Sequence, residues 1–169
     1  MKKWFIALAI FIVTMSVYIY LGGWNEVSVT PLDNKSFKLQ GKLYEGSAKD
    51  LQMGKLFSEI DALIKAQNST EKLTAYYYNA PTKENKYYVK VFIGATYSQE
   101  PKLAEELNIE EYEFGKCLQA QHSSHPILTA VYRETSTYAK EHQLVLDSAI
   151  AVEQYPKDDS LVLWTPVTK

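Results

Sequence analysis

The longest uninterrupted run of apolar residues covers residues 4–21, where Thr14 and Ser16 are the only mildly polar members. A helix of this length spans about 27 Å, which is close to the thickness of the hydrocarbon core of a bilayer. The sequence therefore predicts an N-terminal membrane anchor at residues 1–24 that contacts the membrane through residues 4–21.

The charges around this run set its expected orientation. Lys2 and Lys3 precede it, and the next cation along the chain is Lys35. This asymmetry favours a cytoplasmic N-terminus and a single-pass protein whose domain is extracytoplasmic, either periplasmic or extracellular. A cleaved signal peptide is the alternative, but its cleavage site needs small residues, and bulky ones occupy residues 18–21.

Beyond residue 35 the spacing of apolar positions switches between the period of a strand and the period of a helix. Residues 36–45 alternate as a strand does, and an amphipathic helix then extends to about Gln67. Ser47 and Asp50 are the candidate capping residues of that helix. Two β-rich runs follow, at residues 72–79 and 86–97.

The same order of elements appears a second time after a charged connector at residues 99–111. A strand is predicted at residues 113–121, and Ser124-His125-Pro126 opens a second helix, with proline in the first turn where its missing N–H costs nothing. Two further strands are predicted at residues 149–155 and 161–167. The predicted order is therefore β-α-β-β, repeated once.

This order predicts an α+β fold made of a duplicated β-α-β-β module. We expect an antiparallel sheet with the helices on one face and a ligand groove on the other. Residues 25–35 read as a linker or edge strand, and residues 36–169 form the domain, with halves at 36–98 and 112–169.

Charge and cysteine content exclude several classes of protein. Lys2 and Lys3 are the only charged residues among the first 20, so the remaining 149 residues carry 16 Lys+Arg against 20 Asp+Glu, a formal net charge of −4. Such a domain has too few cations to neutralise the phosphates of a nucleic acid, so we expect no nucleic-acid partner.

The single cysteine, Cys117, excludes an internal disulfide and a cysteine-based zinc site. His122 and His125 have no evident third ligand, so we expect no metal, and no cofactor is indicated.

Tyrosine is unusually common, with 13 Tyr against 6 Phe and 3 Trp. Alternation along the predicted strands separates a row that packs on the helices from an opposite row on the free side of the sheet. The opposite row is aromatic and carries a carboxylate, a combination that suits a flat or cationic organic ligand. The candidate ligand-binding residues are Glu153, Tyr155, Tyr76, Tyr78, Tyr88, Phe92 and Trp164.

The placement of Glu153 depends on the last pair of strands. Ile150 and Val152 form the apolar row of residues 149–155, so we expect them to face the helices and Glu153 and Tyr155 to face the free side. The alternative is that the tyrosines simply cover a two-sided sheet, where aromatic residues are favoured in any case.

Three stretches of the chain resemble the gyrase-inhibitory-protein-like (GyrI-like) small-molecule-binding family, which includes the effector-binding domains of AraC-type and MerR-type regulators. The first is the strand at residues 37–46 with the amphipathic helix after it. The second is the tyrosine run at residues 75–81, which leads into Asn-Ala-Pro. The third is Glu153-Gln154-Tyr155 with the apolar strand 161–167. Together the likeness covers about residues 25–169.

The resemblance implies a ligand groove between the two halves with Glu153 at its centre. Asn79 stands where many members of the family have Asp. No helix-turn-helix precedes the module in this sequence, so we expect a stand-alone binding module rather than a transcription regulator.

Three functions follow from these observations. The leading hypothesis is a membrane-anchored module that binds a lipophilic or cationic aromatic ligand. One alternative is a hydrolase of an electrophilic small molecule with Glu153 as general base, but no nucleophile–base pair accompanies it, which favours binding over catalysis. The other alternative is a protein–protein interaction module of the envelope, with an unspecified partner.

Overall fold

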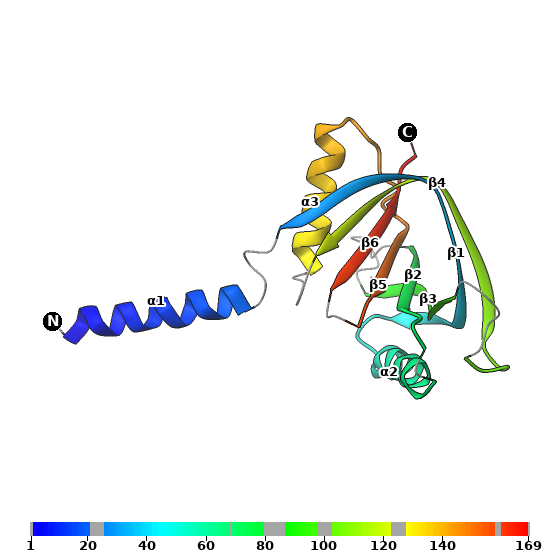
Figure 1. Cartoon of the computed structure of the whole chain (residues 1–169), viewed down its shortest axis with the longest axis horizontal. Helices are drawn as coiled ribbons and strands as arrows, with labels where there is room; N and C mark the ends of the chain where they lie inside the picture. The colour runs from blue at the N-terminus through cyan, green and yellow to red at the C-terminus, as the bar shows by residue number, and fades with distance from the viewer. Residues whose placement is uncertain are drawn as a thin grey trace.

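The computed structural model describes residues 2–20, 26–67, 69–79, 87–97, 103–122, 128–157 and 160–168. These contain the helices α1 (Lys2–Tyr20), α2 (Leu51–Ala66) and α3 (Leu128–Glu141). They also contain the strands β1 (Val27–Ser47), β2 (Leu73–Asn79), β3 (Tyr88–Tyr97), β4 (Asn108–His122), β5 (Ala151–Tyr155) and β6 (Leu161–Pro166) (Figure 1). The α+β class is confirmed, and the elements after α1 follow the predicted order. The helix start at residues 124–126 lies outside the described residues.

The prediction of an N-terminal membrane anchor is wrong. Among the described residues, no helix combines the length and the apolar character that crossing a membrane requires. α1 has 19 residues and begins with Lys2 and Lys3, so its uncharged part is at the lower end of the roughly 17–25 residues of membrane-spanning helices. Three further predictions depended on that anchor and are wrong for the same reason. They are the membrane contact at residues 4–21, the single-pass topology and the extracytoplasmic location.

The six strands form an antiparallel sheet that closes into a barrel in the order β1-β3-β2-β5-β6-β4. β1 closes it, because its C-terminal part pairs with β3 and most of its length pairs with β4. β1 is continuous from Val27 to Ser47, so it runs through most of residues 25–35, which the sequence assigned to a linker or edge strand. Figure 1 shows α1 extending away from the barrel.

The outer face of the sheet is covered by α2 and α3. Val91 and Ile93 of β3 pack with Ile60 and Ile64 of α2, all of them buried. Asp50 caps α2, because its carboxylate accepts a hydrogen bond from the backbone N–H of Gln52. On the other half, Val131 of α3 packs with a small buried group of residues from β4, β5 and β6: Ala120, Ala151, Leu161 and Leu163.

The inner face of the sheet is buried as well, which differs from the expected free face. Leu39, Phe92 and Val152 belong to one cluster in the barrel interior and are fully buried. Val152 therefore points away from the helices, and Glu153 and Tyr155 point toward them, the reverse of the expectation. The reason is that the barrel buries one side of β5 and the helices bury the other, so apolar character does not tell the two rows apart.

Two glycines allow β1 and β3 to approach where the barrel closes. Gly41 lies opposite Gly94 in the register. A Cβ built on Gly41 would lie 2.0 Å from the backbone oxygen of Ile93, and one on Gly94 would lie 2.6 Å from the backbone oxygen of Gln40. Since both obstacles are backbone atoms, a side chain at either position requires the strands to separate.

We therefore expect Gly41→Ala to lower the free energy of unfolding by about 3 kcal/mol or more, because the added methyl group overlaps the paired strand. Gly54→Ala on α2 is the matched control, since a Cβ at Gly54 meets nothing within 4 Å. It should raise stability by about 0.5–1 kcal/mol through helix propensity. Urea denaturation of both variants measures the difference, and equal effects would contradict the close approach.

Candidate functional site

A cavity of about 1180 Å³, partly open to solvent, lies between the sheet and the two helices. Both halves of the domain contribute to its wall. Among its lining residues are Met53, Phe57 and Ile64 from α2, Tyr132 and Thr135 from α3, Tyr77 from β2, Ala151, Glu153 and Tyr155 from β5, and Thr165 from β6. The wall is therefore mostly apolar and aromatic with a few polar groups, as in sites for organic ligands.

Glu153 is the polar centre of this cavity, and its side chain is almost completely buried, with 4% of the residue exposed. The Tyr132 hydroxyl donates to Glu153 Oε1 at 2.7 Å. The Tyr155 hydroxyl donates to the other carboxylate oxygen. Tyr77 lies near the same carboxylate, whose negative charge helps to raise the pKa of the Tyr77 phenol. Two phenols, from α3 and β5, thus hold one carboxylate, and a third phenol from β2 lies beside it.

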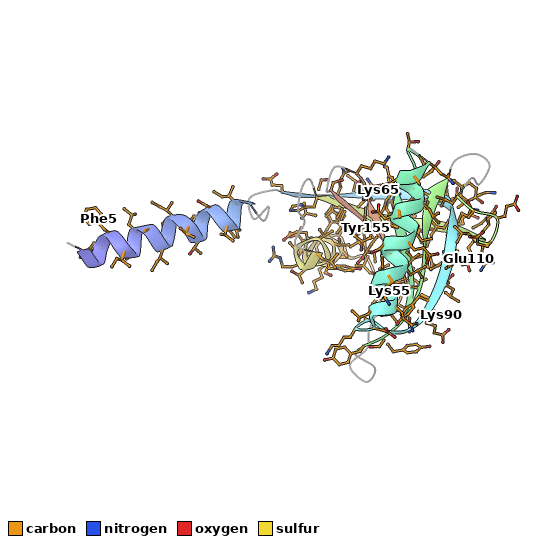
Figure 2. The ribbon with its side chains drawn as sticks, turned by 90° about the horizontal axis from the view of Figure 1, so that it is seen from below. Phe5, Lys55, Lys65, Lys90, Glu110 and Tyr155 are labelled. Atoms are coloured by element: carbon orange, nitrogen blue, oxygen red, sulfur yellow. The ribbon has the colours of Figure 1, made fainter. Side chains whose placement is uncertain are left out.

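Packing fixes the orientation of these tyrosines. Figure 2 shows Tyr155 beside α2, where its ring meets Phe57 edge-on with 6.0 Å between centroids. Tyr77 and Tyr155 also lie on neighbouring, hydrogen-bonded strands, since β2 pairs with β5. The carboxylate is therefore positioned by side chains that are themselves anchored in the core.

The phenols remain protonated because of where they lie. Burial raises the pKa of Tyr77, Tyr132 and Tyr155, and the negative charge of Glu153 raises each of them further. A protonated phenol is a hydrogen-bond donor, so all three hydroxyls remain available to Glu153 throughout the neutral pH range.

No cation of the described chain neutralises Glu153. The ion pairs between described residues involve other acids. The two lysines that line the cavity have other partners: Lys65 Nζ lies 2.5 Å from Asp61, and Lys157 Nζ donates to the backbone oxygen of Ser69 at 2.6 Å. The carboxylate thus has hydrogen-bond donors but no counter-charge among the described residues.

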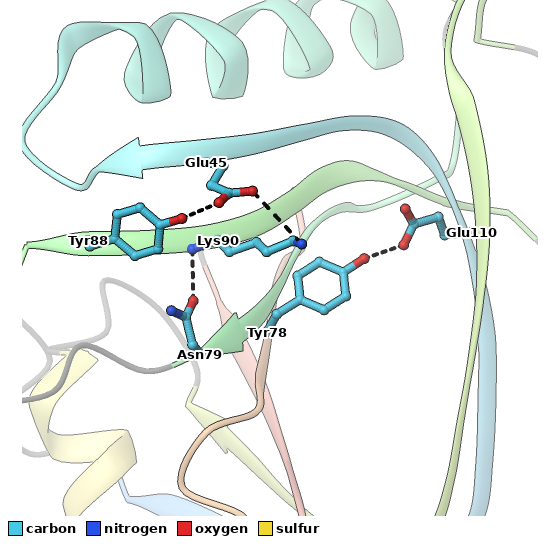
Figure 3. Close-up of polar contacts among 6 residues, drawn as sticks. All are labelled: Glu45, Tyr78, Asn79, Tyr88, Lys90 and Glu110. Carbon is cyan, nitrogen blue, oxygen red and sulfur yellow. Dashed lines mark hydrogen bonds and ion pairs between the residues drawn. The ribbon is translucent and has the colours of Figure 1, made fainter. Parts of the chain in front are cut away.

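The predicted site residues lie in three places: the cavity, the barrel interior and the exposed surface. Glu153 and Tyr155 line the cavity, whereas Tyr76, Phe92 and Trp164 are buried in the barrel interior. Tyr78 packs against the interior cluster and donates to Glu110, and Tyr88 donates to Glu45 at an exposed position (Figure 3). The structure therefore does not bring these five aromatic residues to Glu153.

The Glu110 carboxylate forms a second carboxylate–tyrosine cluster with Tyr78 and Tyr112, outside the cavity. Both hydroxyls donate to Glu110, and they lie 2.7 Å from each other. Lys90 Nζ lies 5.6 Å from the Tyr78 ring centroid, and the Lys90 backbone N–H donates to the Asn79 side chain at 2.8 Å (Figure 3). These bonds tie β2, β3 and β4 together at one end of the barrel.

Sequence reasoning missed two residues of the cavity, Tyr77 and Tyr132. Tyr77 stands between Tyr76 and Tyr78, so strand alternation directs it to the opposite face, and that face is the one that carries Glu153. Tyr132 follows buried Val131 on α3, three residues before buried Thr135. Its position beside the buried face of an amphipathic helix was the available signal.

A metal site receives no support from the described side chains. They contain no group of three or more His, Cys, Asp or Glu residues that could bind a metal ion together. His122 is buried in β4, and His125 lies outside the described residues.

No protein-family model matches the chain, and no curated protein is significantly similar to it. Among solved structures, the C-terminal domain of EcmrR is similar with a TM-score of 0.56 and 12% identity, over 86% of this chain and 98% of that domain. An integron cassette protein from the mobile metagenome of Vibrio cholerae is similar with a TM-score of 0.53 and 10% identity, over 83% of this chain and 95% of that one. A hydrolase from Listeria innocua is similar with a TM-score of 0.51 and 12% identity, over 85% of this chain and 92% of that one. At 10–12% identity, these likenesses show the fold alone.

The raised pKa of the cavity tyrosines predicts a loss of stability in alkali. Between pH 10, where tyrosines of the unfolded chain ionise, and the higher folded-state pKa, the unfolded state loses protons that the folded state keeps. Stability is therefore fully present below pH 10 and falls above it, by about 1.4 kcal/mol per pH unit for each such tyrosine.

Tyr132→Phe removes one of these cavity tyrosines, so the free energy of unfolding of the variant should fall less steeply with pH above pH 10. Urea denaturation at a series of pH values from 9 upward measures the slope for the wild type and the variant. Tyr87→Phe is the control, because Tyr87 has an exposed side chain and does not line the cavity. A Tyr132→Phe slope equal to that of the wild type would show that Tyr132 does not stay protonated beside Glu153.

Proposed function

We propose that this protein binds a lipophilic organic cation in the cavity between α2 and α3, with Glu153 as the counter-charge. One observation carries the proposal. A buried carboxylate, held by two phenols and without a cationic partner in the described chain, faces a large cavity with apolar walls.

The energetics favour a cation of this kind. A carboxylate that is out of water and has no counter-charge is costly, and hydrogen bonds from phenols offset only part of that cost. A bound cation supplies the missing charge, and the attraction is stronger here than in water because the effective dielectric constant is lower. Tyr77, Tyr132 and Tyr155 add ring faces that attract cations. A lipophilic cation enters more readily than a small hydrated one, since it loses less hydration.

The likeness to the EcmrR C-terminal domain is one of fold, and the sequence resemblance to effector-binding domains is what supports a binding role of that type. The hydrolase alternative has less support from the geometry. Each oxygen of Glu153 already accepts a hydrogen bond from a phenol, so the carboxylate is poorly placed to take a proton from water. The phenols themselves have a raised pKa, which makes them weak acids and poor nucleophiles at neutral pH.

A pair of probes with the same shape and opposite charge tests the proposal. Tetraphenylphosphonium should bind the wild-type protein, and tetraphenylborate should bind much more weakly. Glu153→Gln keeps the size of the side chain but removes the charge. It should weaken phosphonium binding about tenfold or more, because a charge pair at low dielectric contributes more than about 1.4 kcal/mol. Isothermal titration calorimetry measures all the affinities.

Glu110→Gln is the matched control, because Glu110 is also held by two tyrosines but does not line the cavity. It should leave phosphonium binding unchanged. Equal affinity of the wild type for the two probes, or equal losses in the two variants, would rule out Glu153 as the counter-charge.

A further inference from the structure

Thr165 of β6 is the residue of the cavity wall that the binding of a simple cation leaves unexplained. Leu161 and Leu163 precede it at alternate positions of β6 and pack on the side of α3. Strand alternation therefore directs Thr165 to the same side, where it lines the cavity. Thr165 is 7% exposed, and its hydroxyl has no hydrogen-bond partner among the described residues.

A buried hydroxyl without a partner is unusual, because it has given up water without gaining a bond in return. Thr135, on the opposite wall of the same cavity, shows the ordinary arrangement. It is also buried, and its hydroxyl donates to the backbone oxygen of Val131 at 2.8 Å. The Thr165 hydroxyl thus has unused bonding capacity, but its oxygen is covered in the free protein, so a bond with a molecule in the cavity requires the side chain to rotate about χ1.

The sheet register places this hydroxyl at a defined separation from Glu153. Glu153 pairs directly with Leu163, and Thr165 is two residues further along β6 on the same face. Diagonal neighbours of this kind have Cβ atoms about 7–8 Å apart. Ala151 is the cavity-lining residue of β5 on the same side, and its small side chain leaves space between the two polar groups.

We propose that Thr165 is a second binding point, which selects cations that carry a hydroxyl, ether or carbonyl oxygen several bonds from the charge. The cationic centre lies at Glu153, and the oxygen exchanges a hydrogen bond with Thr165. The cavity has room for both ends, since about 1180 Å³ is above the roughly 300–1,000 Å³ typical of sites for one drug-sized ligand. This inference rests on the proposed function and adds the length and polarity of the ligand to it.

Two phosphonium salts that differ in one group test this selection. Hydroxybutyl-triphenylphosphonium carries a terminal hydroxyl, and pentyl-triphenylphosphonium has a methyl group in its place. The wild type should prefer the hydroxyl compound, and Thr165→Val should reduce that preference about three- to tenfold, as expected for one hydrogen bond. Thr165→Ser keeps a hydroxyl and should keep the preference. Thr74→Val should keep it as well, because the Thr74 hydroxyl is already bonded to the backbone oxygen of Lys72 and Thr74 does not line the cavity.

Thermal unfolding of the free protein gives a second readout. Thr165→Val removes an unpaired buried hydroxyl at constant shape, so it should raise the melting temperature while it lowers the preference for the hydroxyl compound. If both salts bind but Thr165→Val leaves their ratio unchanged, the second binding point is refuted and the cation site stands. If neither salt binds the wild type, the proposed function fails and the second binding point fails with it.

Discussion

The architecture depends on a short segment of β1 that is paired on both of its edges. Residues 38–41 pair with β3 on one side and with β4 on the other, whereas the rest of β1 pairs with one of these strands at a time. Gly41 lies in this segment, and its missing side chain lets the backbones approach. Closure here gives the sheet an inside and an outside, so both faces become buried and the ligand cavity forms on the outside, beneath the helices.

The two carboxylate–tyrosine clusters, at Glu110 and at Glu153, lie on different parts of the barrel and have different consequences. Glu110 is half-buried and lies at one end of the barrel, where it joins strands that close packing already holds together. Glu153 is buried and faces open space, where its hydrogen bonds hold a charge without neutralising it. The same residue types thus stabilise the barrel at Glu110 and leave a buried charge without a counter-charge among the described residues at Glu153. The two clusters differ in their consequences because Glu153 faces the cavity and Glu110 does not.

Much of the order of elements could be predicted from the sequence, because strands and helices differ in the period of their apolar positions. Ile60 and Ile64 share the buried face of α2, and Val91 and Ile93 share one face of β3, as that period requires. Which row of β5 meets the helices could not be predicted, since Val152 and Glu153 are equally well buried, on opposite sides of the sheet. Glu153 was identified, but its neighbours Tyr77 and Tyr132 depend on strand order and helix placement, which no local pattern contains.

The two helices belong to different halves of the duplicated module and share only β1 among the strands on which they pack. α2 packs on β1, β2 and β3, and α3 packs on β1, β4 and β6. Strands are joined by continuous hydrogen bonds, whereas helices are attached to a sheet by side-chain packing, which yields more easily. A molecule in the cavity would therefore contact two helices that are attached to the sheet separately. Occupancy would be converted into the distance between α2 and α3, a quantity that is readable from outside the domain without any rearrangement of the barrel.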